Sequence, residues 1–570
     1  MIAFNQAPPQ GTVRDWLDQQ AKVRGDRVAY RFTDGAADLS WAGLRDIARA
    51  QAQGLTALGM TKGESLAVMM PNGRAALETL FAGLYGGFRV TMINLAAGND
   101  AIAYAFEHCE ARFASVGPDQ QEQFAATCPD GLRPLPDDLD LGAQVPLHSL
   151  SPGDDALLMY TSGTTGQPKG VVHSHSSLLA GGWTTASAHG LTEHDCGYCV
   201  LPICHINGLC VSVMGCLISG GQLLLAPKFS NSRFWSDIEA GAVTWFSVVP
   251  TIISHVLHCA QDPSNAVKAQ LRFGRSASSA LAPDVQTAFE HRFGVPIIET
   301  MGMTETAAQM LSNPLPPAPR KIGSPGIAMG NQVAILRSDL SEAGDNEQGE
   351  IAIRGPNVMK EYLKNPDATR ASFTPDGWLL SGDLGHRDED GYVFVTGRLK
   401  ELIIKGGENI APREVDEALY AHADVVEAAA FAQPCATYGE RVVAAVTLCA
   451  GSSVTAAELI DMCTRRLGAF KAPETVYVLE DLPKGPLGKN SEEKIGRYDV
   501  GRGDRRLKSL RRSVKKDAIF RQALKAGLEH GIIGLGSVRL CQMLCQFGKL
   551  AIAFRHGQTR ESTGREDAPQ

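Results

Sequence analysis

The most conspicuous group of reactive side chains lies in a short loop rich in hydroxyls and glycine. An apolar run ends at Tyr160 and is followed by Thr161-Ser-Gly-Thr-Thr-Gly-Gln-Pro-Lys-Gly170. The glycines let the backbone come close to an anion, the hydroxyls supply donors, and Lys169 supplies a mobile positive charge. The pattern therefore predicts a phosphate-binding loop. A polar surface turn is the alternative, which so regular a run of small and hydroxylated residues disfavours.

This loop differs from the common P-loop. Counted from Gly163, the Walker pattern needs Gly, Lys and Ser/Thr at the fifth, sixth and seventh following positions. This chain has Pro168, Lys169 and Gly170 there. The hydroxyl that holds magnesium in a P-loop is therefore missing.

Two further places combine side chains that suit a magnesium nucleotide. Thr304 and Glu305 follow the apolar residues 296–298, and they offer a hydroxyl donor for a phosphoryl oxygen and a carboxylate for a hard cation. A plain helix start at Thr304 is an equally good interpretation. Asp383 and Arg398 each end a short predicted strand, where an aspartate could accept two ribose hydroxyls and an arginine could meet phosphate or ribose. Taken alone, either is more typical of an ordinary turn.

A cluster of cysteines raises the question of a metal. Cys196 and Cys199 form a CxxC pair that is followed closely by Cys204 and His205. We favour buried apolar cysteines over zinc, because the run 199–204 predicts a buried strand along which neighbouring ligands would point to opposite faces. The 13 cysteines, an odd number scattered through apolar runs, indicate reduced thiols and a cytoplasmic location.

Composition favours a globular protein that handles small molecules. The 570 residues are 44% hydrophobic and 20% charged, with a net charge of −8, so several cores are expected and nucleic acid is not an expected partner. The first residues lack the pattern of a secretory signal, and no uncharged apolar run reaches the about 18 residues of a membrane span.

The elements that position these residues alternate between helix and strand. The spacing of apolar residues predicts helices at 12–23 and 74–85 and strands at 27–32, 65–70 and 88–94. This alternation indicates an α/β class with layers and largely parallel strands. Residues 116–155 are expected to be an irregular connection. Ser174 is expected to cap a helix that begins at His175, and His173 and His175 are more typical of structural than of functional histidines.

Seven motifs in order resemble the successive core motifs of the adenylate-forming acyl-CoA synthetases, over roughly residues 12–497. They are Thr161–Gly170, Ser276–Pro283, Gly302–Glu305, Ser381–Asp383, Gly397–Ile403, Gly406–Asn409 and Leu482–Lys489. The resemblance implies a large multi-layer α/β domain (1–397), a hinge (398–400) and a small mobile α+β C-terminal domain (401–497). It also implies an acid–CoA ligase that joins a carboxylate to ATP, releases pyrophosphate, and then exchanges AMP for the thiol of coenzyme A.

The resemblance further implies a role for each matching residue. Thr304 would meet the α-phosphate, Glu305 would bind Mg²⁺, and Lys489 would bridge carboxylate and phosphate oxygens during adenylation. Lys400 would be the pivot of a domain rotation that brings the CoA-binding Gly406 and Gly407 into place. The implied ATP-binding residues are Thr161, Ser162, Gly163, Thr164, Thr165, Lys169, Ser278, Ser279, Gly302, Met303, Asp383 and Arg398.

The chain departs from the family pattern at two places near these residues. Met301 stands where the family has an aromatic residue before the Gly-x-Thr-Glu motif, and Asn490-Ser-Glu-Glu-Lys494 replaces the usual basic residues after Lys489. A ligase that loads a carrier protein and a non-catalytic nucleotide-binding scaffold therefore stay as alternatives. Retention of the catalytic residues favours catalysis over the scaffold, and we expect free CoA as the acceptor, with a carrier protein as the alternative.

The acid is the least determined part of the prediction. The stretches 234–238, 245–251 and 273–283 resemble the oxalate–CoA ligases, so Arg275 is a candidate partner for a second carboxylate, with His205 at the family's gating position. The alternative is that Arg275 points to solvent while Met301 and Met303 line a channel for a medium-chain or aromatic acid.

The last segment, 498–570, extends beyond the resemblance and is expected to be helical. Residues 502–525 contain ten Lys/Arg against two acids. A solvated helix followed by a docking helix is the favoured interpretation, and contact with an anionic membrane surface or with nucleic acid is the alternative. The oligomeric state is not predicted.

Overall fold

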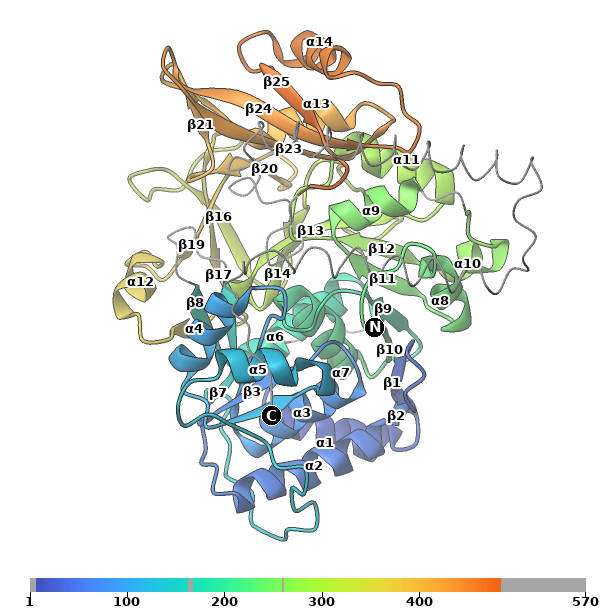
Figure 1. Ribbon diagram of the computed structural model, residues 1–570, viewed down its shortest axis with the longest axis vertical. Coiled ribbons are helices and arrows are strands. Elements are labelled where there is room, and N and C mark those ends of the chain that lie inside the picture. The colour runs from blue at the N-terminus through green and yellow to red at the C-terminus, as the bar shows by residue number, and fades with distance from the viewer. Residues whose placement is uncertain (1–6, 162–167, 259–260, 483–570) are drawn as a thin grey trace, which may run out of the picture. The chain divides into compact units, whose positions relative to one another are not determined.

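The structure is a computed structural model that describes residues 7–161, 168–258 and 261–482 (Figure 1). All structural statements below concern these residues. The predicted site residues Ser162, Gly163, Thr164, Thr165 and Lys489 lie outside them, as does the expected helical extension.

The first large sheet has the strand order β18-β8-β7-β4-β3-β5-β6. Neighbouring strands from β7 to β6 run parallel, whereas β8 is antiparallel to both of its neighbours, β7 and β18. Every residue of β3 and β4 is buried, as expected for central parallel strands covered on both faces. The strands are β3 Ser65–Met69, β4 Arg89–Met92, β5 Phe113–Val116, β6 Arg133–Pro134, β7 Asp155–Thr161, β8 Lys169–Ser174 and β18 Glu361–Tyr362.

The second large sheet has the order β15-β14-β13-β12-β11-β9-β10-β1-β2. It is parallel from β13 to β1 and antiparallel at both edges. The strands are β1 Val28–Phe32, β2 Leu39–Ser40, β9 Cys196–Cys199, β10 Gln222–Leu225, β11 Trp245–Val248, β12 Phe273–Ser276, β13 Ile297–Met303, β14 Ala308–Ser312 and β15 Ile327–Ala328.

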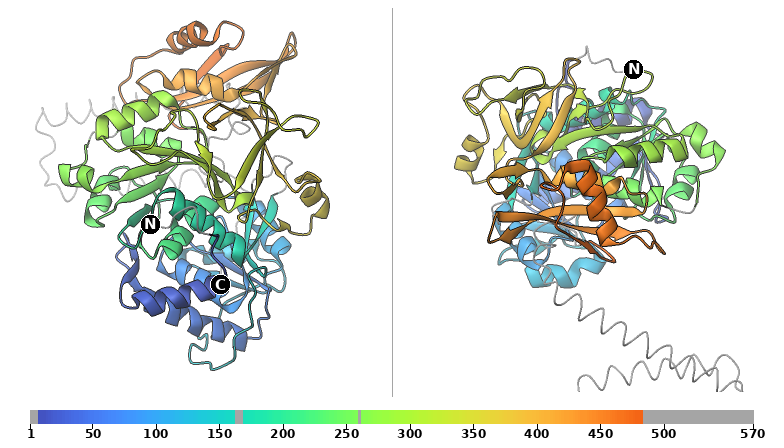
Figure 2. Two further views of the ribbon diagram at one scale, coloured as in Figure 1. Left: turned by 180° about the vertical axis from the view of Figure 1, so that it is seen from behind. Right: turned by 90° about the horizontal axis from the view of Figure 1, so that it is seen from above.

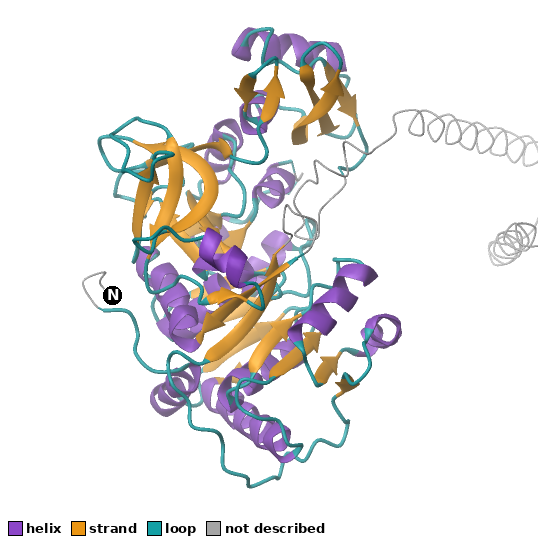
Figure 3. Ribbon diagram, turned by 90° about the vertical axis from the view of Figure 1, so that its left-hand side faces the viewer, coloured by secondary structure: helices purple, strands orange, loops and turns teal. Residues whose placement is uncertain are grey.

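Helices cover these sheets and lie between them, as the three ribbon views show (Figures 1, 2 and 3). Helix α6 contacts β7 and β8 of the first sheet and β14 of the second, so it lies between the two. The helices are α1 Val13–Arg24, α2 Trp41–Ala57, α3 Arg74–Gly86, α4 Asn99–Cys109, α5 Gln121–Thr127, α6 His175–Ala188, α7 Gly215–Ser219, α8 Phe234–Ala240, α9 Pro250–Leu257, α10 Asn265–Gln270, α11 Pro283–Phe293 and α12 Pro366–Ala371. Three irregular helices are η1 Pro118–Gln120, η2 Asn207–Met214, which is a π-helix, and η3 Thr304–Thr306.

Two smaller sheets follow along the chain. The four-stranded antiparallel sheet β16-β17-β19-β20 is made of Gln332–Leu336, Gly349–Arg354, Leu379–Arg387 and Val393–Arg398. The five-stranded sheet has the order β22-β21-β24-β23, with β25 beside β24, and α13 Pro412–Tyr420 and α14 Ala456–Leu467 pack on it. Its strands are β21 Ile403–Lys405, β22 Glu408–Ile410, β23 Val425–Cys435, β24 Gly439–Leu448 and β25 Thr475–Val478.

The predicted α/β class is confirmed, and local rules explain where several elements begin. Thr12 accepts from the backbone N–H of Asp15 in a capping box, so α1 begins at Val13. Ser174 accepts from the N–H of Ser177 and caps α6 as predicted.

Two predictions about local structure are wrong. Residues 116–155 are not wholly irregular, because they contain α5, whose Phe124 packs into a buried cluster with Phe106. The expected strand at 199–204 instead ends at Cys199, and the backbone N–H of His205 donates to the carbonyl of Pro202 (3.1 Å) in a turn. Proline has no N–H for a strand ladder, so Pro202 disfavours a strand that runs through residues 199–204. In the described part of the chain no group of three metal-binding side chains occurs, and no helix is long and apolar enough to cross a membrane.

Candidate active site

The base of the predicted phosphate loop is a β-hairpin between β7 and β8. Thr161 and Lys169 face each other at the ends of these strands, and both are partly buried. Gly170 follows where a Cβ would lie 2.9 Å from the Leu158 side chain. The loop therefore begins and ends on two paired strands, which fixes the position of Lys169.

Lys169 and Glu305 both contact Tyr362, a residue that no sequence motif indicated. The Tyr362 hydroxyl donates to Oε1 of Glu305 (2.8 Å), and Nζ of Lys169 lies 4.5 Å from the centre of the Tyr362 ring. Burial raises the pKa of the Glu305 carboxyl, while Tyr362 and the positive charges of Lys169 and Arg398 oppose that rise. The phosphate-loop lysine and the predicted metal ligand thus belong to one electrostatic group.

Two hydrogen bonds to backbone carbonyls hold the Thr304–Glu305 turn. His173 Nε2 lies 2.7 Å from the Thr304 carbonyl, to which it must donate, and the N–H of Met359 donates to the Glu305 carbonyl (2.7 Å). Burial lowers the pKa of His173 to about 4, so it is neutral at pH 7. A neutral His173 that donates to the Thr304 carbonyl is compatible with the predicted structural role, and η3 is a single short turn that contains Thr304.

Gly302 is required where β13 and β14 approach each other. A Cβ at this position would lie 1.7 Å from the Ala308 carbonyl oxygen, a distance no side chain tolerates. The neighbouring Met301 and Met303 are partly buried and pack against the cluster around Met310 and Leu311.

Asp383 and Arg398 form an ion pair across β19 and β20. They are direct partners in the antiparallel register, and Nε of Arg398 lies 2.7 Å from Oδ1 of Asp383. The aspartate is buried, whereas the arginine side chain is 48% exposed and its Nη1 also lies 3.5 Å from Oε1 of Glu401. The two residues that the sequence suggested separately are therefore brought together.

Arg275 is buried at 1% exposure, which excludes the alternative that it points to solvent. Its Nη1 donates to Oδ1 of Asn207 (2.9 Å) and to Oγ of Ser247 (3.1 Å), and its Nε donates to Oε1 of Gln309 (3.4 Å). No described carboxylate pairs with it. Burial lowers the pKa of its guanidinium to about 9, which leaves it charged at pH 7. The core of the protein thus contains a cation framed only by neutral groups.

Asn207 connects this arginine to the predicted nucleotide loop. Its Nδ2 donates to Oγ of Ser278 (3.2 Å), and Ser278 has φ of 75°, a left-handed conformation that is uncommon for a residue with a side chain. The adjacent Ser279 is exposed. His205 lies two residues before Asn207, is partly buried, and precedes η2.

The predicted hinge and CoA-binding residues lie on the surface of the following segment. Lys400 is exposed in a turn after β20. Gly406 and Gly407 have φ of 60° and 89° and form the exposed two-residue connection between β21 and β22, a conformation that favours glycine.

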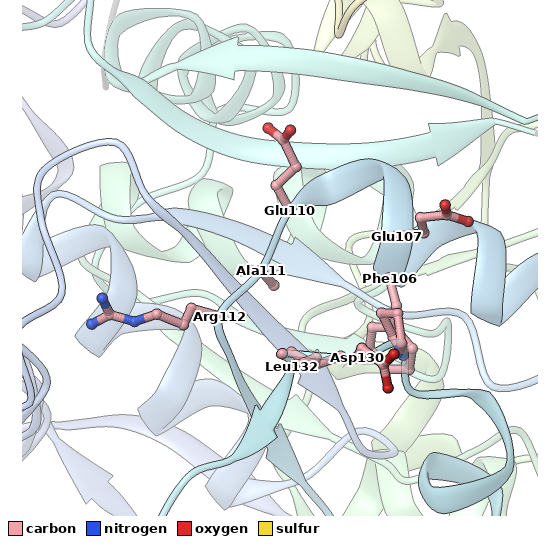
Figure 4. Close-up of a pocket in the computed structure, with 9 residues that line it drawn as sticks. Phe106, Glu107, Glu110, Ala111, Arg112, Asp130 and Leu132 are labelled. Atoms are coloured by element: carbon pink, nitrogen blue, oxygen red, sulfur yellow. The ribbon is translucent and has the colours of Figure 1, made fainter.

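The residues present are compatible with a bound magnesium nucleotide. Magnesium is commonly held by one or two carboxylates together with substrate phosphates rather than by a complete protein cage. Glu305 supplies one buried carboxylate, with Lys169 and Arg398 close enough to influence its pKa. A surface pocket of about 310 Å³ lies elsewhere, between the end of α4 and the residues that follow α5, and it is lined by Phe106, Glu110 and Asp130 (Figure 4).

Comparison with known proteins shows which protein family has this fold. The AMP-binding enzyme family matches residues 17–363, and the C-terminal domain of AMP-binding enzymes matches residues 414–489. A sulfoacetate–CoA ligase of Cupriavidus necator is 42% identical over 477 residues, which are 81% of this chain and 93% of that protein. An oxalate–CoA ligase of Arabidopsis thaliana is 40% identical over 341 residues, which are 59% of this chain and 66% of that protein.

Solved structures share the fold with its large N-terminal and small C-terminal domains. An o-succinylbenzoate coenzyme A synthetase of Bacillus subtilis in complex with ATP and magnesium superposes with a TM-score of 0.73 at 28% identity, over 84% of this chain and 98% of that one. Such a fold defines an ATP-dependent ligase that forms AMP. The chain belongs to the AMP-binding enzyme family, as the motifs predicted, and as an acid–CoA ligase it uses ATP, magnesium and coenzyme A.

Proposed function

We propose that the protein forms the CoA thioester of a short acid that carries a second anionic group. The observation that carries this proposal is Arg275, a buried guanidinium with three neutral partners and no described carboxylate. An unpaired charge in the protein interior is costly, and arginine can offer two parallel hydrogen bonds to an anion. A substrate carboxylate or sulfonate would complete the ion pair.

The relatives support the same class of acid. The names of the similar ligases give sulfoacetate, oxalate and o-succinylbenzoate, each of which has a second anionic group besides the carboxylate that can be activated. The neutral partners Asn207, Ser247 and Gln309 are all buried and polar, which favours a short polar acid over an alkyl chain. Met301 and Met303, the side chains expected to line an apolar channel, pack instead against the cluster around Met310.

The remaining residues take roles in the two half-reactions. Thr161 and Lys169, with the hydroxyls of the loop between them, hold the β- and γ-phosphates, and Thr304 donates to the α-phosphate. Asp383 binds the ribose hydroxyls beside Arg398. Lys489 bridges the carboxylate and the α-phosphate, where its charge offsets the negative charge of the transition state. Bound magnesium, on Glu305, supplies further neutralisation of phosphate charge.

The second half-reaction needs a different set of residues. Rotation about Lys400 withdraws Lys489 and brings the exposed Gly406–Gly407 turn toward the pantetheine of CoA. His205 lies close in sequence to Asn207 and gates access of the acid.

The test is a comparison of kcat/KM for oxalate, malonate, sulfoacetate, butyrate and octanoate, with free CoA as the acceptor. Wild type is expected to prefer an acid with two anionic groups. In Arg275→Met, kcat/KM for that acid should fall about 30-fold or more, because removing one partner of a buried charge pair costs about 2–5 kcal/mol. Butyrate should change little.

Arg272→Met is the matched control, since Arg272 lies just before β12 and pairs with Asp195. It should keep the wild-type preference among acids. A wild type that prefers octanoate, or a preference for diacids that survives Arg275→Met, ends the proposal.

A further inference from the structure

Tyr362 occupies the space between two groups of opposite charge. Its hydroxyl donates to Oε1 of Glu305 (2.8 Å) and its ring faces Nζ of Lys169 (4.5 Å to the ring centre). The side chain is only 6% exposed. One residue thus contacts both the lysine that ends the phosphate loop and the carboxylate of the Thr304–Glu305 turn.

Backbone hydrogen bonds join the segment around Tyr362 to the segments that carry Lys169 and Glu305. Strand β18 pairs with β8, so that Tyr362 is opposite Val171, and the N–H of Leu363 donates to the Gly170 carbonyl (2.8 Å). On the other side, the N–H of Met359 donates to the carbonyl of Glu305 (2.7 Å). Because the segment 359–363 is attached at both ends, the tyrosine side chain has little freedom to move.

We propose that Tyr362 is a positioning residue that holds Glu305 for magnesium and Lys169 for phosphate. This inference rests on the proposed function, which assigns those roles. The hydroxyl fixes one carboxylate oxygen and leaves the other for the metal, while the face of the ring holds the ammonium group by its quadrupole. The two contacts use different parts of one side chain, so they can be removed separately.

The first experiment uses Tyr362→Phe, which removes the hydroxyl and keeps the ring. ATP binding is measured by titration calorimetry at a series of Mg²⁺ concentrations and in excess EDTA, and ATP–pyrophosphate exchange is measured in parallel. The Mg²⁺ concentration that gives half of the maximal gain in ATP affinity should rise about 10-fold, as for loss of a hydrogen bond to a charged group. ATP affinity in EDTA should stay at the wild-type value.

The second variant, Tyr362→Leu, removes the ring as well. ATP affinity in EDTA should then fall about threefold, because the ring no longer holds the Lys169 ammonium group. Thermal unfolding of each variant checks that the fold is kept, and Tyr362→Phe alone carries the test if the leucine variant does not fold.

The chain offers a closely matched control in Tyr392. Its hydroxyl donates to the Pro319 carbonyl (2.7 Å), its ring lies 4.8 Å from Nζ of Lys321, and it is 7% exposed. Tyr392→Phe should leave the Mg²⁺ dependence unchanged.

Glu305→Gln tests the metal-binding role of Glu305 separately from the positioning role of Tyr362. If it shifts the Mg²⁺ dependence and Tyr362→Phe does not, the role of Tyr362 is refuted while the role of Glu305 stands. If Glu305→Gln has no effect on the Mg²⁺ dependence, the metal role in the proposed function is refuted, and the inference with it. An equal loss of ATP affinity with Mg²⁺ and in EDTA in Tyr362→Phe would show a general structural role and also refute the inference.

Discussion

Asp383 and Arg398 form an ion pair that suggests a ligand site, whereas either residue alone is typical of an ordinary turn. Arg398 ends β20, whereas Asp383 lies in the middle of β19 and not at a strand end as expected. The antiparallel register of β19 and β20 places the two residues opposite each other, with Nε of Arg398 2.7 Å from Oδ1 of Asp383. The buried aspartate fixes Nε of the arginine, while Nη1 lies 3.5 Å from Oε1 of Glu401 and the side chain is about half exposed. The pair therefore offers carboxylate oxygen and guanidinium N–H groups to one ligand.

Asp383→Asn tests this residue-scale interpretation. The amide keeps the size of the side chain but accepts more weakly from ribose hydroxyls and no longer pairs with Arg398. ATP affinity is expected to fall about 10-fold, which corresponds to about 1.4 kcal/mol, in the range for a hydrogen bond to a charged group. Titration calorimetry with ATP measures it, and unchanged affinity would remove Asp383 from the nucleotide site.

At the scale of elements, the turn between β13 and β14 controls the position of Thr304 and Glu305. The strands approach so closely that Gly302 faces the carbonyl of Ala308, and Ala307 and Ala308 have φ of 44° and 81°. These left-handed residues reverse the chain direction sharply after Thr304–Thr306. The close approach of the two strands leaves no space for a side chain at Gly302.

Gly302→Ala should therefore displace the turn. We expect the free energy of unfolding to fall by about 1–3 kcal/mol, as for other overpacked sites, and ATP affinity in the presence of Mg²⁺ to fall with it. Urea unfolding and calorimetry measure the two effects. Gly153→Ala is the control, because no atom lies within 4 Å of a Cβ there. Equal stability of both variants would show that the strands can separate at little cost.

At the scale of the whole molecule, buried histidines make stability depend on pH. His175 is fully buried, its Nδ1 accepts from the N–H of Val13 (3.4 Å), and burial lowers its pKa to about 4. In the unfolded chain a histidine has a pKa of about 6.5. Between these values the unfolded state binds the extra proton, so the free energy of unfolding falls as the pH falls below about 6.5 and is unaffected above it.

His175→Gln should reduce this loss of stability in acid. A single such histidine contributes about 2 kcal/mol of destabilisation between pH 7 and pH 5, at about 1.4 kcal/mol per pH unit below 6.5. The variant is therefore expected to lose about 2 kcal/mol less than wild type over that interval in urea unfolding. His194→Gln, at an 81% exposed side chain, is the control. Parallel pH profiles of wild type and His175→Gln would contradict the assignment.

Local sequence determined a large part of this protein. Helix caps at Thr12 and Ser174, the apolar runs of β3 and β4, and the alternation of helix and strand depend on neighbouring residues, so the amino-acid sequence alone is enough to predict them. The order of motifs likewise predicted the family, because each motif is a short stretch with its own chemistry. The wrong predictions were also about local structure. Strand β9 ends at Cys199 and does not continue through Pro202, and the short helix α5 lies within a polar segment that was expected to be irregular.

Only the tertiary structure decided which distant side chains meet. Arg275 is buried because residues 207, 247 and 309, far from it in sequence, surround it with neutral partners. Tyr362 joins Lys169 to Glu305 because β18 adds to the edge of β8, and no periodicity or spacing encodes that pairing. Such contacts depend on sheet order and on the packing of separate layers, which are properties of the whole chain.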